Sequence, residues 1–452
     1  MEHALRAIRL GELDVTTAID ENRLNAFGLS VLFLCALVIA VDGFDVQVIS
    51  YVAPVLTSSL HISRSMLGPV FSSGLVGTTI GALVFGPLAD RAGRKTMLCL
   101  SILLFAAGTL ATMGASGIGT LVLWRAVSGL GLGGATPIAV AFAAEFSPRR
   151  IRSTAVMLVY CGFAVGAGGG GMIAARMLPA LGWRAVFLLG GLTPLVLLAA
   201  LLVWLPRSIE DLGRRGDGAA IAAILKRLIP GVAADPMAVV RMGERAAGFP
   251  VGRLFAEGRA VRTAFLWAMF FTNILALYFM VSWLPTLAHA SGLSVADAVR
   301  AGSTLQLGSL IGTILLSLLA RRLEAMAVIG LGFLGGAASL ALFSVVGGSV
   351  GSFTLVAFLA GFFVIGTQTG ANAVGALIYP ASLRATGIGW ALGIGRAGSI
   401  LGPSIGGMLL AMQWPTGDLF IAAAVPALLA SVCAFVLSRR LGGASEVVGA
   451  AA

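Results

Sequence analysis

Residues 27–55 read FGLSVLFLCALVIAVDGFDVQVISYVAPV, an apolar stretch that contains two aspartates, Asp42 and Asp45. About 20 apolar residues are enough to cross the roughly 30 Å hydrocarbon core of a membrane as a helix. An ionised carboxylate at that depth costs about 2.5 to 3.5 kcal/mol on insertion scales, so a pair of them indicates a function. The stretch therefore predicts a transmembrane helix whose aspartates carry a proton.

The rest of the chain has the same apolar character. Of its 452 residues, 58% are hydrophobic and only 11% are charged, and the mean hydropathy is +0.99. A soluble globular protein is far less apolar, so the composition indicates a polytopic membrane protein in contact with the lipid bilayer. We expect twelve spans, at approximately residues 28–51, 67–88, 97–116, 119–142, 153–175, 184–205, 262–285, 300–320, 325–347, 352–376, 387–411 and 417–437.

The placement of the basic residues decides what the net charge of +11 means. Nucleic-acid binding requires that they form one solvated face, whereas here they are spread along the chain between the spans. If the N-terminus is inside, the outer segments hold only Arg64, Arg176, Arg184 and Arg300. By the positive-inside rule, this asymmetry predicts an inner-membrane protein with both termini in the cytoplasm and no nucleic-acid partner.

The longest polar stretch divides the chain into two halves of six spans each. Secondary transporters use two such repeats with a cavity between them, so we expect an all-α membrane fold of two pseudo-symmetric six-helix bundles. The predicted domains are an N-terminal tail, a first bundle, a central cytoplasmic loop, a second bundle and a C-terminal tail, at residues 1–26, 27–205, 206–261, 262–438 and 439–452.

A sequence repeat supports this division. Residues 145–154 read EFSPRRIRST after the fourth predicted span, and residues 379–386 read YPASLRAT after the tenth. Each segment then enters a glycine-rich span. Glu145, Arg152 and Arg384 occupy these segments and are predicted to be structural or gating residues.

The loop after the second predicted span reads GPLADRAGRK, residues 86–95. Glycine and proline favour a tight turn, an aspartate can cap the next helix, and the basic residues keep the loop inside. Taken alone, the loop is also compatible with a simple solvated turn. Together with the twelve spans and the central loop, it resembles the signature loop of the major facilitator superfamily. That resemblance implies a gating loop formed by Gly86, Asp90, Arg91, Gly93, Arg94 and Lys95.

Three further segments resemble the aromatic acid:proton symporters of that superfamily, which import 4-hydroxybenzoate, protocatechuate, benzoate and similar acids. They are DGFD at 42–45, the region from Arg125 through GLGLGG at 129–134, and SWLP at 282–285. In that family both aspartates of the first span are needed for transport, which implies this role for Asp42 and Asp45. The second half departs from the superfamily pattern, because LARRLE at 319–324 has lost most of the glycine signature.

The two aspartates are three residues apart and point to roughly the same face of a helix. Two carboxylates in a cavity of low dielectric constant repel each other, so at least one is expected to hold a proton near neutral pH. The alternative is that one of them is structural and pairs with an arginine across the bundle.

Two arginines fall within predicted spans. Because Arg396 lies within a span, it needs an anion, and the planar guanidinium group suits the two oxygens of a substrate carboxylate. The alternative is a permanent salt bridge to Asp42, Asp45 or Glu145. Arg125 is predicted to assist proton transfer or substrate entry, or else to extend to the outer surface.

Uncharged polar and aromatic residues in the spans complete the predicted binding site. Gln368 and Asn372 are one helical turn apart and share a face. Polar groups in such spans either line a cavity or hydrogen-bond across helices. The predicted substrate-binding residues are Arg396, Arg125, Gln368, Asn372, Asn273, Tyr278 and Phe44.

The sequence contains no pattern typical of a metal site or of catalysis. Cys35, Cys99, Cys161 and Cys433 have no paired spacing, and the three histidines are scattered. We therefore expect no enzyme, no metal and no cofactor apart from the co-transported proton, and a monomer.

These features predict a proton-coupled importer of an aromatic carboxylate that works by alternating access of its two bundles. One alternative is a transporter of the same superfamily for another organic acid, or a drug exporter. Another, from a different class, is a transporter-like chemoreceptor that binds aromatic acids without moving them.

Overall fold

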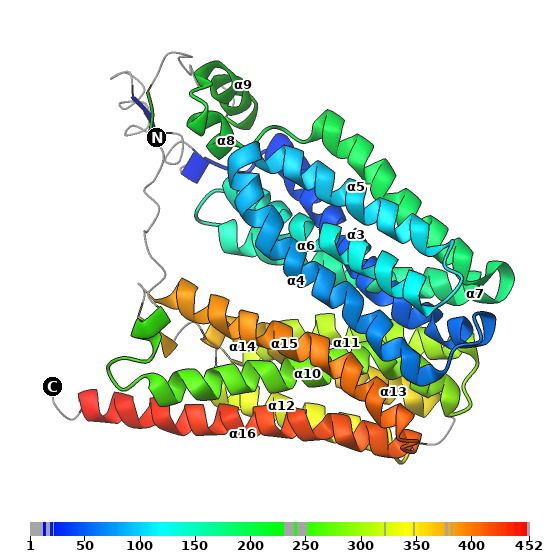
Figure 1. Cartoon of the computed structure of the whole chain (residues 1–452). Helices are drawn as coiled ribbons and strands as arrows, with labels where there is room; N and C mark the ends of the chain where they lie inside the picture. Colours follow the sequence, from blue (N-terminus) through cyan, green and yellow to red (C-terminus); the bar gives the residue numbers. More distant parts are fainter. Residues whose placement is uncertain are drawn as a thin grey trace.

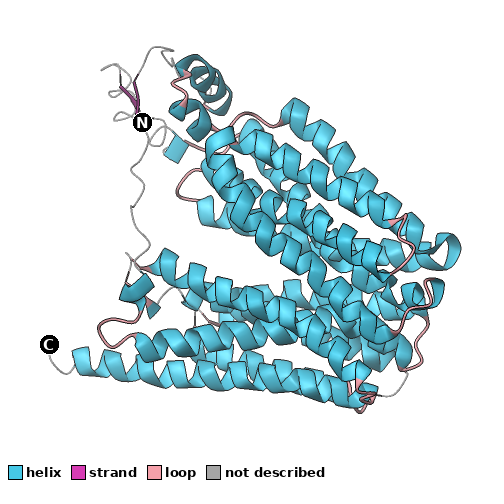
Figure 2. Ribbon diagram, in the orientation of Figure 1, coloured by secondary structure: helices cyan, strands magenta, loops and turns pink. Residues whose placement is uncertain are grey.

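The computed structural model describes residues 12–14, 19–20, 22–229, 239–241, 251–320, 322–346, 349–375, 378–380 and 383–449. The described chain is almost entirely helical and forms two bundles (Figures 1 and 2). Parts of the predicted tails and of the predicted central loop lie outside the described residues.

The first bundle contains five long helices. One of them, α7, has 53 residues and includes Gly182 with φ 75° and ψ 175°, so it consists of two helical arms that meet at a sharp break. Only glycine adopts this backbone conformation readily. The elements are α3 (Ala26–Ser59), η1 (Arg64–Met66), α4 (Leu67–Ala92), α5 (Arg94–Thr112), α6 (Ile118–Glu145) and α7 (Arg152–Trp204).

The second bundle contains one segment, residues 350–375, that is helical throughout but changes to a π-helical turn at its centre. The elements are α10 (Ala260–Ala290), α11 (Val295–Leu319), α12 (Ala325–Leu342), α13 (Val350–Ala360), η3 (Gly361–Ile365), α14 (Gly366–Gly375), α15 (Arg384–Ala411) and α16 (Thr416–Gly449).

Short elements lie outside the two bundles. They include two helices in the central segment that the sequence did not predict, and a pair of parallel three-residue strands. These elements are β1 (Glu12–Asp14), α8 (Ile209–Arg214), α9 (Gly218–Leu228), β2 (Val239–Arg241) and η2 (Val251–Leu254).

Ten helices in the described part are long and apolar enough to span a membrane. One of the ten is α7, whose two arms correspond to the predicted spans at 153–175 and 184–205. The ten leave out α15, which corresponds to the predicted span at 387–411. The two-bundle helical fold is therefore confirmed, while the number of twelve spans stays a prediction.

The glycine-rich segment at 129–134 brings α6 against α4. A Cβ atom at Gly129 would lie 2.1 Å from the carbonyl oxygen of Gly74, and one at Gly133 would lie 2.1 Å from that of Thr78. Small residues allow this contact between backbones, which is common where helices pack in membranes.

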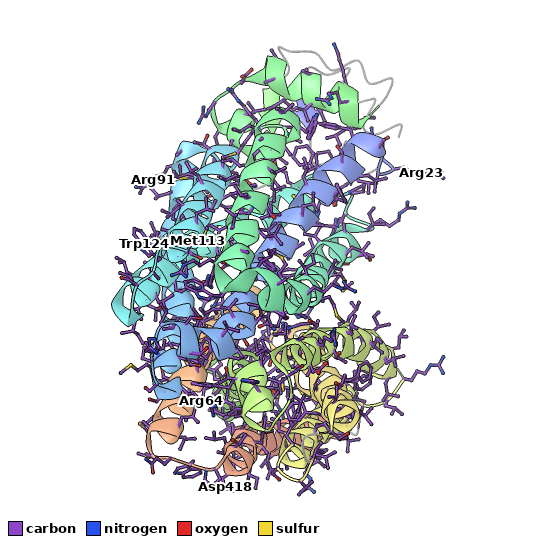
Figure 3. The ribbon with its side chains drawn as sticks, turned by 90° about the vertical axis from the view of Figure 1, so that its right-hand side faces the viewer. Arg23, Arg64, Arg91, Met113, Trp124 and Asp418 are labelled. Carbon is purple, nitrogen blue, oxygen red and sulfur yellow. The ribbon has the colours of Figure 1, made fainter. Side chains whose placement is uncertain are left out.

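The two bundles meet at one end of the molecule and diverge toward the other, which carries α8 and α9 (Figure 1). We call these the far end and the α8 end. The contacts between bundles pair α7 with α11, α4 with α15 and α3 with α10. Figure 3 looks onto the far end and shows Arg64 of η1 near the junction, where η1 contacts α15.

Hydroxyl groups supply polar contacts at the far-end junction, within a cluster of apolar residues from both bundles. The Oγ of Ser72 lies 2.8 Å from the Oγ of Ser404 and donates a hydrogen bond to the carbonyl of Ile400. Ser50 donates to the carbonyl of Val281, at 2.8 Å. We call this set of contacts the far seam.

The sequence repeat corresponds to a repeated local structure. Arg152 donates from Nε to the carbonyl of Ser147 at 3.2 Å, and Arg384 donates from Nε to the carbonyl of Tyr379 at 3.2 Å. In both halves the carbonyl belongs to the residue before a proline. Each arginine therefore holds the turn that leads into the next helix.

Candidate functional site

A buried ion pair joins Asp45 of α3 to Arg125 of α6. The Nη2 of Arg125 lies 2.9 Å from Oδ2 of Asp45, and its Nη1 lies 3.0 Å from Oδ1. Neither side chain is more than 4% exposed. Arg125 therefore does not reach the outer surface, and this pair matches the alternative in which one aspartate pairs with an arginine across the bundle.

Two hydroxyl groups complete the surroundings of Asp45. Thr109 donates a hydrogen bond to Oδ1 at 3.0 Å, and Ser128 donates to Oδ2 at 3.2 Å. An ionised carboxylate has about four acceptor positions. With Arg125 and these hydroxyls, all four positions of Asp45 are occupied, so this carboxylate is fixed in one geometry.

Asp42 lies one helical turn away with fewer partners. Its Oδ2 accepts a hydrogen bond of 2.6 Å from Thr136 of α6, and its side chain interacts electrostatically with Arg396 of the second bundle. Both aspartates thus share a face of α3, as their spacing predicted, and that face contacts α6. Asp42 also interacts electrostatically with the other bundle.

Gly43 brings α7 next to the aspartates. A Cβ atom there would lie 2.2 Å from the carbonyl oxygen of Phe163, so the backbones of α3 and α7 are in direct contact. The ring of Phe44 packs against Gly170 and Gly190 of α7 inside the first bundle. Phe44 was predicted to bind the substrate, whereas in the structure its ring packs against these two glycines.

Arg396 of α15 is exposed and makes no ion pair with any described residue. Two of the acidic partners considered for it are paired elsewhere, Asp45 with Arg125 and Glu145 with Arg94. With Asp42 it has an electrostatic interaction across the two bundles. Its guanidinium therefore has donors available for an added anion.

Two tyrosines from opposite bundles lie in the region of Asp42 and Arg396. Tyr278 of α10, which was predicted, and Tyr160 of α7, which was not, are each within electrostatic range of both charged groups. The sequence offered one signal for Tyr160, because the whole chain contains only four tyrosines.

The predicted amides form a hydrogen-bonded row within the second bundle. Asn273 donates to Oε1 of Gln368 at 2.7 Å, and Gln368 donates to Oδ1 of Asn372 at 3.1 Å. Gln368 and Asn372 share a face, as predicted. The row connects helices α10 and α14, and Asn273 within it is fully buried.

A cavity lies where the first bundle meets α10. It is lined by Arg125, Thr78, Gly74, Tyr278 and Ser282, among others. The Nε of Arg125 is buried and has no hydrogen-bond partner in the described part of the chain. Arg125 therefore holds Asp45 with its two Nη groups, while its Nε has no partner among the described residues.

The predicted gating loop is held on the first bundle at the α8 end. Arg94 forms ion pairs with Glu145, at 3.0 Å, and with Glu210 of the central segment. Ser208 donates to Glu145 at 3.0 Å, and Asp211 accepts a hydrogen bond from the backbone of Arg94. The network thus connects the loop to α8, a partner that the sequence did not reveal.

The other residues of the loop have separate roles in its shape. Gly93 has φ 103° and ends α4, Gly86 faces open space and Arg91 is exposed. Asp90 lies 3.8 Å from Arg214 of α8, and Lys95 donates to the carbonyl of Leu202 at 2.9 Å. The predicted tight turn is wrong, because Gly86, Asp90 and Arg91 belong to α4 and Arg94 and Lys95 to α5, so that only Gly93 lies between the two helices. The gating role of these residues stays a prediction.

The described residues contain no group of three or more histidine, cysteine or acidic side chains that could hold a metal ion.

Comparison with known proteins places the chain in a family. The model of the Major Facilitator Superfamily matches residues 35–394. The 4-hydroxybenzoate transporter PcaK of Pseudomonas putida is 37% identical over 93% of this chain and 94% of its own length. The gallate transporter of the same organism is also 37% identical, over 93% of this chain and 94% of its own length.

Solved structures agree on the fold. The partially occluded, inward-open xylose transporter XylE of E. coli has a TM-score of 0.70 with 19% identity, covering 90% of this chain and 97% of that one. Proteins of this superfamily are membrane transporters and not enzymes. The chain belongs to the major facilitator superfamily, in the same family as these aromatic acid transporters.

Proposed function

We propose that the protein is a proton-coupled secondary transporter that imports an aromatic carboxylate of the hydroxybenzoate or benzoate type. The names of the similar transporters support the substrate class. The observation that carries the proposal is the placement of Arg396, an arginine without an ion-pair partner among the described residues, opposite Asp42 on the other bundle.

Arg396 binds the substrate carboxylate in this proposal. A guanidinium presents two parallel N–H donors that match the two oxygens of a carboxylate. A cation in a span is costly without an anion, so a bound acid stabilises the site by pairing with Arg396.

Asp42 carries the proton, whereas Asp45 positions Arg125. Asp45 is saturated by four donors, whereas Asp42 accepts one hydrogen bond among the described residues and interacts electrostatically with Arg396 of the second bundle. When Asp42 is protonated, it no longer competes with the substrate for Arg396. When it loses the proton, its carboxylate competes for the same cation and favours substrate release, which couples the two ligands.

In this proposal the α8 end, where the two bundles diverge, faces the cytoplasm. The bundles diverge at the α8 end (Figure 1), and the positive-inside rule assigns that end and both termini to the cytoplasmic side of the inner membrane. Import then requires the far seam to open and the α8 end to close, by rocking of one bundle against the other.

Uptake by proteoliposomes tests the proposal. Labelled 4-hydroxybenzoate should accumulate faster when the outside is acidic than when the pH is equal on both sides. Asp42→Asn should retain exchange of internal for external substrate and lose accumulation driven by the pH gradient. Full gradient-driven accumulation by Asp42→Asn would refute the proton-carrying role, and uptake of aliphatic acids in preference to aromatic ones would refute the substrate class.

A further inference from the structure

The side chain of Tyr160 remains without an assigned role after the charged residues have been placed. It lies in α7 of the first bundle and is 49% exposed. Its hydroxyl makes no hydrogen bond with another described residue. A large, half-exposed tyrosine beside two charged groups of a transport site is a candidate for contact with the substrate.

Helix packing places Tyr160 close to Asp42. The backbone of Phe163, three residues further along α7, touches Gly43, which directly follows Asp42. Residues three apart in a helix are neighbours on its surface. The position of Tyr160 therefore follows from the contact between α3 and α7, and its electrostatic interaction with Asp42 agrees with this.

Helix periodicity also directs Tyr160 toward the second bundle. Gly171 contacts the Oγ of Ser303 in α11 of that bundle. Eleven residues separate Tyr160 from Gly171, which is about three helical turns, so both lie on the same stripe of α7. Tyr160 is nearer the α8 end, where the bundles diverge, and this explains why its side chain is accessible.

Tyr278 occupies the corresponding place in the second bundle. It belongs to α10, is half-buried and interacts with the same pair, Asp42 and Arg396. Two phenol groups, one from each bundle, thus lie within electrostatic range of the cation that is available for a carboxylate. Aromatic pairs prefer offset-stacked or edge-to-face contacts with ring centroids 4.5 to 7 Å apart.

We infer that Tyr160 contacts the aromatic ring of the transported acid, opposite Tyr278, and so selects aromatic over aliphatic carboxylates. This inference rests on the proposed function. Arg396 recognises the carboxylate, which aromatic and aliphatic acids share. The two tyrosine rings recognise the aromatic ring, which only the aromatic acids have. Since Tyr160 and Tyr278 belong to different bundles, a ring held between them also favours the approach of one bundle to the other.

Kinetics of Tyr160 variants test the inference. Tyr160→Leu should raise the KM for labelled 4-hydroxybenzoate about tenfold, the scale of one aromatic contact, whereas Tyr160→Phe, which keeps the ring, should stay within about threefold of the wild type. Trp204→Leu is the matched control, because Trp204 is an exposed aromatic residue at the C-terminal end of the same helix. Its KM should equal that of the wild type.

A second measurement does not depend on transport. Tyr160→Cys, made in a variant without the four natural cysteines, should react with a water-soluble maleimide, and 4-hydroxybenzoate should slow that reaction more than hexanoate does. A wild-type KM in Tyr160→Leu, or equal labelling rates with and without 4-hydroxybenzoate, would overturn the inference. If the wild-type protein takes up no aromatic acid, the proposed function itself fails, and the inference fails with it.

Discussion

Arg125 holds both oxygens of Asp45, at 2.9 and 3.0 Å, in a site from which water is almost entirely excluded. Such a pair contributes little net stability when it is intact, because both charges lose their hydration. Removal of one partner is costly, since it leaves the other charge buried without compensation. The pair therefore fixes α3 and α6 in one relative position.

Asp45→Asn should destabilise the protein by about 3 to 5 kcal/mol, the usual cost of breaking a buried pair. The double variant Asp45→Asn with Arg125→Gln should recover much of that loss, because no charge is then left unpaired. Thermal unfolding in detergent measures both effects. Asp297→Asn is the control, since its pair with Arg300 is exposed and is worth about 0 to 1 kcal/mol. Equal stability of the two single variants would contradict this account.

Arg396→Gln should raise the KM for an aromatic acid by at least about tenfold, because it removes a charge-assisted contact worth roughly 1.5 to 3 kcal/mol. Arg396→Lys should be intermediate, since it keeps the charge but loses the fork. Initial uptake rates over a range of substrate concentrations measure the KM. A role in folding alone would instead lower the amount of protein and leave the KM of the remainder unchanged.

Gly43→Ala should abolish transport, because the new methyl group would meet the carbonyl of Phe163 at 2.2 Å. Neither backbone has room to move without separating α3 from α7. The control is Gly169→Ala in α7, where nothing lies within 4 Å of the added atom; alanine also favours a helix over glycine by about 1 kcal/mol. Size-exclusion profiles and uptake should distinguish the two variants, and normal uptake by Gly43→Ala would show that the contact is not required.

Ser72→Cys combined with Ser404→Cys should form a disulfide across the far seam, where the two native oxygens are 2.8 Å apart. Oxidation should stop uptake by locking the far end closed, and a reducing agent should restore it. The four natural cysteines are replaced first, and each single variant serves as a control. Unimpaired uptake by the oxidised double variant would mean that this end does not open.

The features that the sequence predicted are those that depend on position within one helix. The spacing of Asp42 and Asp45 placed both on one face, and the spacing of Gln368 and Asn372 brought their amides into contact. Helical periodicity alone decides such relationships.

The features that the sequence did not predict depend on how separate helices pack. Arg125 is 80 positions from Asp45, and no local pattern identifies it as the partner. The packing of Phe44 was missed for the same reason, because the glycines that its ring contacts are on α7. The scarcity of tyrosine was the one signal for Tyr160 in the sequence, and only the contact between α3 and α7 placed it near Asp42.

The far seam has a further consequence for the energetics of the molecule. Its polar contacts are mainly hydrogen bonds from serine hydroxyls, each worth only about 1 kcal/mol net because water offers similar partners once the seam separates. A ligand with modest differential affinity can then reverse the populations of two conformations that differ by a few kcal/mol. Weak, water-replaceable bonds suit a boundary that opens and closes once in every cycle.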